Sequence, residues 1–194
     1  MGKIYSLDYS TTCSGYAIFD LASSKLESYG VVKNPYKGPK DYPAYQLNRL
    51  RAMADAVIAT FPEDLLTIVV EEINAGKNRI NQKTLSGGHY LFLDRLGAKD
   101  LYKVVFYDTD GATGWRSAKG LGLQLSKSDK LVNKENQKLN KKLPRGKKLP
   151  KITQKTLCCR FVNKTYGLEL TEKENDIADA IGLGHYYLHH IWNR

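Results

Sequence analysis

Apolar and polar residues alternate over three short segments near the start of the chain. Residues 3–9 and 15–20 read as two strands joined by a tight loop rich in Ser, Thr and Gly, and residues 25–33 read as a third. Short alternating runs separated by turn residues are typical of antiparallel strands. The pattern therefore predicts a three-stranded meander.

The next part of the chain alternates between strand and helix patterns. The segment "LLTIVVEEIN" (65–74) is a continuous apolar run closed by two acids. Such a run is typical of a strand that is buried on both faces within a parallel sheet. The whole order predicts an α/β fold, in which one mixed sheet carries helices on both faces. The other elements predicted here are helices at 44–60 and 81–96 and a strand at 101–109.

The end of the chain has a helical pattern. One helix is predicted at 153–167, where a glycine ends it, and another at 171–192. The second helix opens with Thr171 and Glu174, which have the spacing of a capping box. This spacing gives Glu174 a structural role, so it is a poor catalytic candidate.

Most of the positive charge lies in one segment. The 194 residues carry a formal net charge of +10, and residues 127–151 hold ten Lys or Arg against Asp129 and Glu135, a net of +8. Its first half predicts a polar helix and its second half a loop. The segment is either a solvated insertion or an arm that contacts phosphates, and its one-signed charge favours the arm. We expect a single domain over 1–194 with a basic insertion at about 120–152.

Several classes of protein are disfavoured by composition. The three cysteines, Cys13, Cys158 and Cys159, form no CxxC pair, which argues against a disulfide framework or a zinc site. No apolar stretch approaches the ~20 residues that span a bilayer, and no signal peptide is recognisable. We expect a cytoplasmic protein without a membrane partner.

Carboxylates occur at three unusual places. Asp8 interrupts the first strand, Glu71 and Glu72 close the buried strand, and Asp176 and Asp179 share one face of the last helix. If the two strands are parallel neighbours, their acids meet at one edge, and a helix across that edge brings the others there. Clustered carboxylates repel one another unless a cation neutralises them. Hard oxygen ligands indicate Mg²⁺ or Mn²⁺, and two such ions catalyse phosphodiester cleavage.

The motifs "LDYSTTCSGYAIFD", "VVEEINAGKN" and "ENDIADAIGLGHY" together resemble the RuvC-type Holliday junction resolvases. Their order and spacing carry the resemblance, which covers residues 4 to about 187. It implies the ribonuclease H-like fold, a mixed five-stranded sheet of three antiparallel and then parallel strands flanked by helices. It also implies a homodimer that nicks opposed strands of a four-way junction, with no nucleotide cofactor.

The resemblance also implies roles for single residues. It favours Glu71 over Glu72 as a metal ligand, and it assigns the scissile phosphate to Lys155, at the start of the penultimate helix. The full ligand set, expected to hold two Mg²⁺ or Mn²⁺ ions, is Asp8, Glu71, Asp176 and Asp179. The further residues expected to contact DNA are Lys119, Arg116, Lys141, Lys142, Arg145, Lys147, Lys148 and Lys151.

The sequence departs from the bacterial pattern in two ways. The aromatic residue that the bacterial enzymes carry three positions after the catalytic Glu is replaced by Asn74, and the basic insertion is larger. Tyr90 and Trp115 are candidate substitutes for that wedge, although packing roles are favoured for both. These departures resemble the bacteriophage branch, which implies location in a host cytoplasm and a broader preference for branched DNA.

Three alternatives stay open. A different ribonuclease H-like enzyme, such as an RNA–DNA hybrid nuclease, would use the same metal site. An actin-like or sugar-kinase-like ATPase also has a loop like "DYSTTCSG" after an acid, but it needs two such domains. A DNA-binding module without activity gains nothing from four acids facing a phosphate backbone. His185 and His189 lie four apart without a third ligand, so a structural role is expected.

Overall fold

The protein is an α/β structure built on one five-stranded sheet. The computed structural model describes residues 2–73, 79–101 and 103–193. The strand order is β3-β2-β1-β4-β5, with the first three strands antiparallel and with β4 and β5 added in parallel. The predicted mixed sheet is therefore confirmed. The strands are β1 (Lys3–Asp8), β2 (Cys13–Asp20), β3 (Lys25–Lys33), β4 (Leu65–Glu71) and β5 (Val104–Tyr107).

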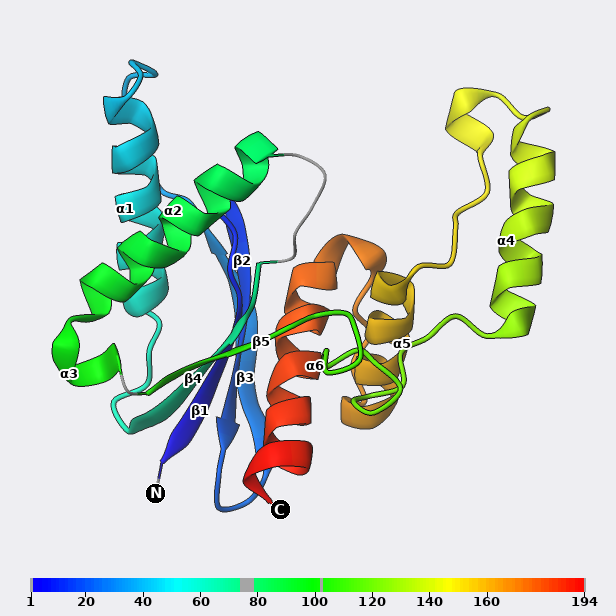
Figure 1. Ribbon diagram of the computed structural model, residues 1–194. Helices are drawn as coiled ribbons and strands as arrows, with labels where there is room; N and C mark the ends of the chain where they lie inside the picture. Colours follow the sequence, from blue (N-terminus) through cyan, green and yellow to red (C-terminus); the bar gives the residue numbers. More distant parts are fainter. Residues whose placement is uncertain (1, 74–78, 102, 194) are drawn as a thin grey trace.

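Helices cover both faces of the sheet (Figure 1). On one side lie α1 (Ala44–Ile58) and α2 (Arg79–Leu96), with the short α3 (Ala98–Leu101) after them. On the other side α6 (Asn175–Tyr187) packs on the sheet, and α5 (Gln154–Tyr166) packs on α6. Within the described ranges, no helix has both the length and the apolar composition that crossing a bilayer requires.

The two faces of the sheet carry separate apolar cores. Ile4 of β1 belongs to the core beneath α6, together with Ile181. The next residue, Tyr5, belongs to the opposite core, together with Met53 and Val57 of α1. Successive strand residues point to opposite faces, so a strand with helices on both sides is apolar throughout. This explains the continuous apolar run in β4.

Three predicted elements are shorter or divided. The predicted strand at 101–109 keeps only β5, because α3 precedes it and the chain turns away after Tyr107, where the backbone N–H of Trp115 donates to the Asp108 carbonyl (2.9 Å). The predicted strand at 65–74 ends at Glu71. The predicted helix at 171–192 begins as a 3₁₀ turn, continues as α6 and ends in a π-helical turn (Leu188–Trp192).

The predicted helix boundaries before and after α5 are confirmed. Gly167 ends α5 in the left-handed region, with φ at 67°. The capping box at Thr171 is also present, since its backbone N–H and its hydroxyl both donate to the Glu174 carboxylate, at 3.0 and 2.9 Å. Glu174 therefore has the structural role that its spacing predicted.

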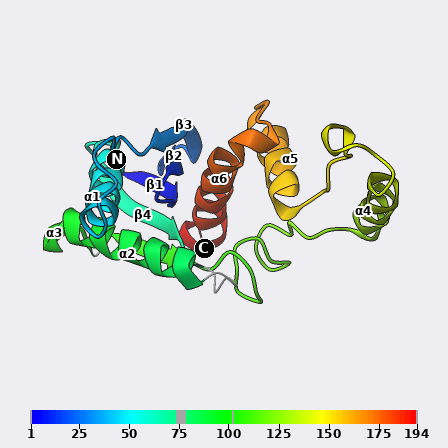
Figure 2. The same ribbon diagram turned by 90° about the horizontal axis from the view of Figure 1, so that it is seen from above.

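The basic segment forms a protruding arm, which we define as residues 126–152. It contains α4 (Lys127–Asn140), which begins at a Ser126 capping box, and an extended segment that returns beside it. No residue of α4 is buried. Figure 2 shows α4 beyond α5, as the outermost part of the molecule. The predicted polar helix followed by a loop is therefore present.

Side-chain amides hold the arm together in place of an apolar core. Asn133 donates to and accepts from the backbone of Ile152 (2.8 and 2.7 Å), and Asn140 does the same with Leu149 (2.9 and 2.7 Å). Asn136 donates to the carbonyl of Pro150 (2.9 Å). We call these three asparagines the asparagine clip. Each amide takes the place of a peptide group in a strand partner, so the return segment has a fixed register on α4.

Candidate active site

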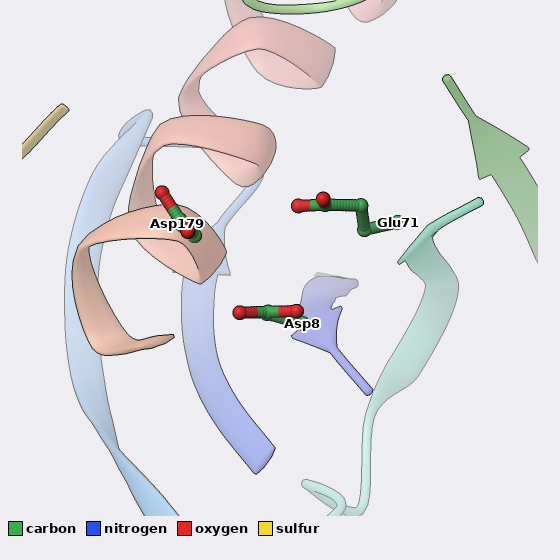
Figure 3. A group of neighbouring side chains, drawn as sticks. All are labelled: Asp8, Glu71 and Asp179. Carbon is green, nitrogen blue, oxygen red and sulfur yellow. The ribbon is translucent and has the colours of Figure 1, made fainter. Parts of the chain in front are cut away.

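Three acids from distant parts of the chain meet at one edge of the sheet. Asp8 ends β1, Glu71 ends β4, and Asp179 lies in α6. Leu7 pairs with Val70 in parallel register, which brings the following residue of each strand to the same edge. One carboxylate oxygen from each of the three acids lies within 4.8 Å of the others (Figure 3).

Helix α6 reaches this edge because β2 has no side chain at Gly15. A Cβ atom there would come within 1.9 Å of the carbonyl oxygen of Asp176. Further along the helix, the Ser6 hydroxyl of β1 donates to the carbonyl of Ala180 at 2.6 Å. These two contacts fix α6 against β1 and β2, so Asp179 points into the cluster.

Burial makes ionisation of the cluster costly. Asp179 is only 1% exposed. Burial raises the pKa of Asp8 well above its usual range, and the nearby charges of Glu71 and Asp179 raise it further. Burial also raises the pKa of Glu71, although the Arg116 guanidinium opposes that rise. A bound cation would remove this cost, so the site is prepared for positive charge.

Arg116 lies inside the cluster instead of on the surface. It is 6% exposed, and its Nη2 atom lies 2.6 Å from Asp179 Oδ1 and 3.7 Å from Glu71 Oε2. Its guanidinium also stacks over the Trp115 ring, 4.5 Å from the ring centroid. The sequence predicted a phosphate contact for this residue, whereas its observed contacts are to the carboxylates.

Two buried carboxylate oxygens have unused capacity. Among the described residues, Glu71 Oε2 and Asp179 Oδ1 accept no hydrogen bond, because the close Arg116 nitrogen lacks the alignment of one. Buried polar atoms without a partner are costly and call for an explanation such as a missing ion. Oxygen donors alone fit a hard divalent cation, Mg²⁺ or Mn²⁺.

Lys155 and Asp176 lie at the rim of the cluster. Lys155 Nζ is 3.9 Å from Asp176 Oδ1 and 4.0 Å from Asp179 Oδ2, and the Lys155 side chain is 53% exposed. Asp176 is not one of the three acids whose oxygens converge. Glu72 turns away from Glu71, and its carboxylate accepts a hydrogen bond from the backbone N–H of Ile73 (2.8 Å). The structure thus brings Lys155 to the predicted acids and leaves Asp176 half exposed beside them.

Thr109 is a site residue that the sequence reasoning missed. Its hydroxyl donates to Glu71 Oε1, and the residue is 1% exposed. It follows β5, whose carboxyl end lies at the same edge as that of β4. A polar residue just after a parallel strand was therefore the available signal.

The remaining candidates lie in several places. Trp115 is fully buried and Tyr90 is 73% exposed on α2, whereas Asn74 lies outside the described residues. His185 packs against His189, and its Nδ1 atom lies 2.7 Å from the Tyr166 hydroxyl, as a structural role requires. The predicted DNA contacts that are exposed are Lys119, Lys141, Lys142, Arg145, Lys147, Lys148 and Lys151.

Comparison with known proteins identifies the fold. No protein-family model and no curated protein sequence matches the chain. Its structure is similar to that of T. thermophilus RuvC in complex with a Holliday junction substrate, with a TM-score of 0.51, 13% identity, and coverage of 96% of this chain and 92% of that one. A second Thermus thermophilus RuvC structure gives a TM-score of 0.51 at 15% identity, with coverage of 95% and 92%.

A weaker similarity links the chain to Fowlpox virus resolvase in complex with Holliday junction DNA. The TM-score is 0.43 at 18% identity, with coverage of 97% of this chain and 98% of that one. At these identities the two RuvC structures establish the fold. The chain has the ribonuclease H-like fold of RuvC, as the sequence motifs predicted.

Proposed function

We propose that this protein is a metal-dependent endonuclease that cuts branched DNA, above all four-way junctions. The observation that carries the proposal is the meeting of Asp8, Glu71 and Asp179 at one edge of the sheet, with their oxygens within 4.8 Å of one another. Two of those acids keep a buried oxygen without a hydrogen-bond donor among the described residues. The fold shared with RuvC supports the same conclusion.

In this proposal each residue has a definite task. Asp8, Glu71 and Asp179 hold the divalent ion, with Asp176 as a further ligand at the rim. The ion supplies an activated water and stabilises the charge that develops on the leaving oxygen. Thr109 orients Glu71 through its hydrogen bond. Lys155, half exposed beside the acids, contacts the scissile phosphate.

The arm is proposed as the main contact to the DNA backbone. It carries most of the excess positive charge, and its cations project from a segment without buried residues in its helix. In Figure 1 the turn at Arg145–Lys147 lies toward the same end of the molecule as the carboxyl ends of β1 and β4. One DNA molecule that contacts both is therefore a reasonable geometry, with Lys119 adding a contact beside the site.

The proposal includes a homodimer. Resolution of a four-way junction requires two opposed nicks, and a twofold-symmetric dimer provides two identical sites for them. Figure 1 places both chain termini at the end of the sheet away from the acids, so neither covers the site. Membership of the bacteriophage branch is part of the same proposal, because the enlarged basic insertion motivates both.

The ATPase alternative is disfavoured by the loop after β1. The backbone N–H of Ser10 donates to the Ser14 hydroxyl (2.9 Å), and that hydroxyl donates to the Ser10 carbonyl (3.1 Å). These bonds satisfy the loop within itself, as in a structural turn. A hybrid nuclease would keep the same acids, so the substrate decides between these two enzymes.

A cleavage assay tests the proposal. Purified protein with Mg²⁺ is given a four-way junction, a fork, a plain duplex and an RNA–DNA hybrid, each with the same arm sequences. We expect the junction to be nicked fastest and all cleavage to stop in EDTA. Asp179→Asn should abolish cleavage while junction binding survives, because the substitution removes a metal ligand and leaves the groups that bind phosphates in place. Preferred cleavage of the hybrid, or normal nicking by Asp179→Asn, would refute the proposal.

A further inference from the structure

A guanidinium inside a carboxylate cluster is unexpected for a site that binds metal ions through those same carboxylates. Arg116 approaches Asp179 and Glu71, two of the three acids that converge. The positive charge therefore lies on the side of the cluster away from Asp8. Any account of how many ions this site holds must include this charge.

The backbone around Arg116 is held firmly in position. The N–H of Arg116 donates to the Thr109 carbonyl (3.2 Å), and the N–H of Leu123 donates to the Arg116 carbonyl (3.1 Å). Thr109 and Leu123 are themselves buried. Arg116 thus belongs to a closed loop, and its main chain cannot move without breaking hydrogen bonds on both sides.

The guanidinium is held by its neighbour as well. It stacks on Trp115, which is fully buried in the core beneath α6. The Trp115 ring lies so close to Gly182 of α6 that a Cβ atom there would come within 2.8 Å of the ring. Since α6 also carries Asp179, the arginine and its carboxylate partner are mounted on one packed unit. Withdrawal of Arg116 on metal binding would require this unit to repack.

A count of formal charges indicates what the site lacks. Four carboxylates, including Asp176 at the rim, face two cations that form ion pairs with them, Arg116 and Lys155. The formal balance is −2 when every carboxylate is ionised. One divalent ion neutralises this charge, whereas two would leave a net positive site in the absence of DNA. Buried charge that is not balanced is strongly unfavourable.

We propose that Arg116 is a resident cation of the site, which limits the DNA-free protein to one divalent ion per chain. A second ion then binds only when a DNA phosphate supplies further negative charge. Arginine suits this role because its guanidinium stays protonated at all pH values relevant to a protein and spans two carboxylates. The inference rests on the proposed function, in that it takes the carboxylates as metal ligands.

Ion counting on the DNA-free protein tests this. Bound Mn²⁺ is counted by electron paramagnetic resonance, and Mg²⁺ binding is followed by calorimetry, for the wild type, Arg116→Gln, Arg116→Lys and the control Arg95→Gln. Arg95 forms an exposed ion pair with Asp55 (3.2 Å), so its loss removes an arginine without touching the site. We expect one ion in the wild type, in Arg116→Lys and in the control, and two ions in Arg116→Gln.

The outcomes separate the inference from the function on which it rests. Two ions in the DNA-free wild type would overturn the inference and leave the metal site intact. An unchanged count in folded Arg116→Gln, or two ions in Arg116→Lys, would also overturn it, because charge would then not set the number. Absence of any bound ion in the wild type would instead refute the proposed metal site. The wild-type count does not depend on any variant folding.

Discussion

Gly15 of β2 lies directly against the main-chain carbonyl of Asp176, where a Cβ atom would come within 1.9 Å of the oxygen. The contact is between backbone and backbone, so no flexible side chain can yield to relieve it. It sets how closely the start of α6 approaches the sheet, and hence how deeply Asp179 reaches between Asp8 and Glu71. The packing of one glycine therefore determines the geometry of the acidic cluster.

Gly15→Ala should damage both stability and metal binding. Forcing a methyl group into this contact should lower the free energy of unfolding by about 1–3 kcal/mol, as overpacking does elsewhere. It should also weaken Mg²⁺ binding, because α6 must move away from β1. Thermal unfolding with and without Mg²⁺ measures both effects.

Gly87→Ala is the matched control for that substitution. Gly87 lies in α2, where an added Cβ would meet only Leu50 Cδ1 at 3.6 Å, an ordinary contact. Replacement should be neutral or stabilising by up to about 1 kcal/mol, because alanine favours a helix more than glycine does. Equal losses of stability in both variants would show that the contact with Asp176 is not the cause.

Glu71 and Glu72 should behave as opposites. Glu71→Gln removes one of the three converging carboxylates, so we expect loss of cleavage and loss of the rise in melting temperature that Mg²⁺ produces. Glu72→Gln should retain both, because that carboxylate accepts a bond from Ile73 and turns away from the cluster. The two variants differ by one position along the chain and remove the same charge. Loss of activity in Glu72→Gln alone would reverse the ligand assignment.

Asp8 should make the metal-free protein less stable as the pH rises. Its pKa is raised by burial and then by repulsion from Glu71, so the folded state holds a proton that the unfolded chain has released. The free energy of unfolding therefore falls as the pH rises from about 4, the usual pKa of Asp, through the raised folded value. The full contribution is present only below the unfolded value.

Melting temperatures in EDTA across this pH interval measure the effect. Asp8→Asn should reduce the slope and raise stability at neutral pH, because it removes a buried charge that other acids repel. Mg²⁺ should stabilise the wild type most at neutral pH, where Asp8 must be ionised to bind it. A wild-type melting temperature that stays level or rises over the interval in EDTA would contradict the prediction.

The arm should account for much of the salt dependence of DNA binding. Replacing Lys141, Lys142, Lys147 and Lys148 by Gln should weaken junction binding and reduce the slope of log K against log salt by about 0.9 for each phosphate that the protein no longer neutralises. Lys25→Gln, at the opposite end of the sheet in Figure 1, should leave the slope unchanged. An unaltered slope in the fourfold variant would make the arm a bystander.

The sequence predicted the parts of the site that follow from strand and helix periodicity. Asp8 and Glu71 could be paired because parallel neighbouring strands end at the same edge, and Asp179 because it lies in a helix that must pack there. The position of Asp176 at the rim depends on the rotation of α6, which Gly15 sets. Helical spacing alone does not contain that angle.

Arg116 could not be placed in the same way. Its contacts depend on how the loop after β5 folds back onto Thr109 and on how Trp115 packs against α6. Neither follows a repeating pattern, so a basic residue there was read as a surface phosphate contact. The asparagine clip was missed for a similar reason, because its partners are backbone groups of a segment without periodic structure.

The asparagine clip separates the shape of the arm from its attraction to DNA. Its hydrogen bonds join neutral amides to peptide groups, so ionic strength that detaches DNA leaves the fold of the arm unaffected. Lysines on its outer surface can be gained or lost without disturbing its register, and asparagines can change its reach without altering its charge. Two independent sets of positions are thus available to natural variation, one for how tightly DNA is held and one for where.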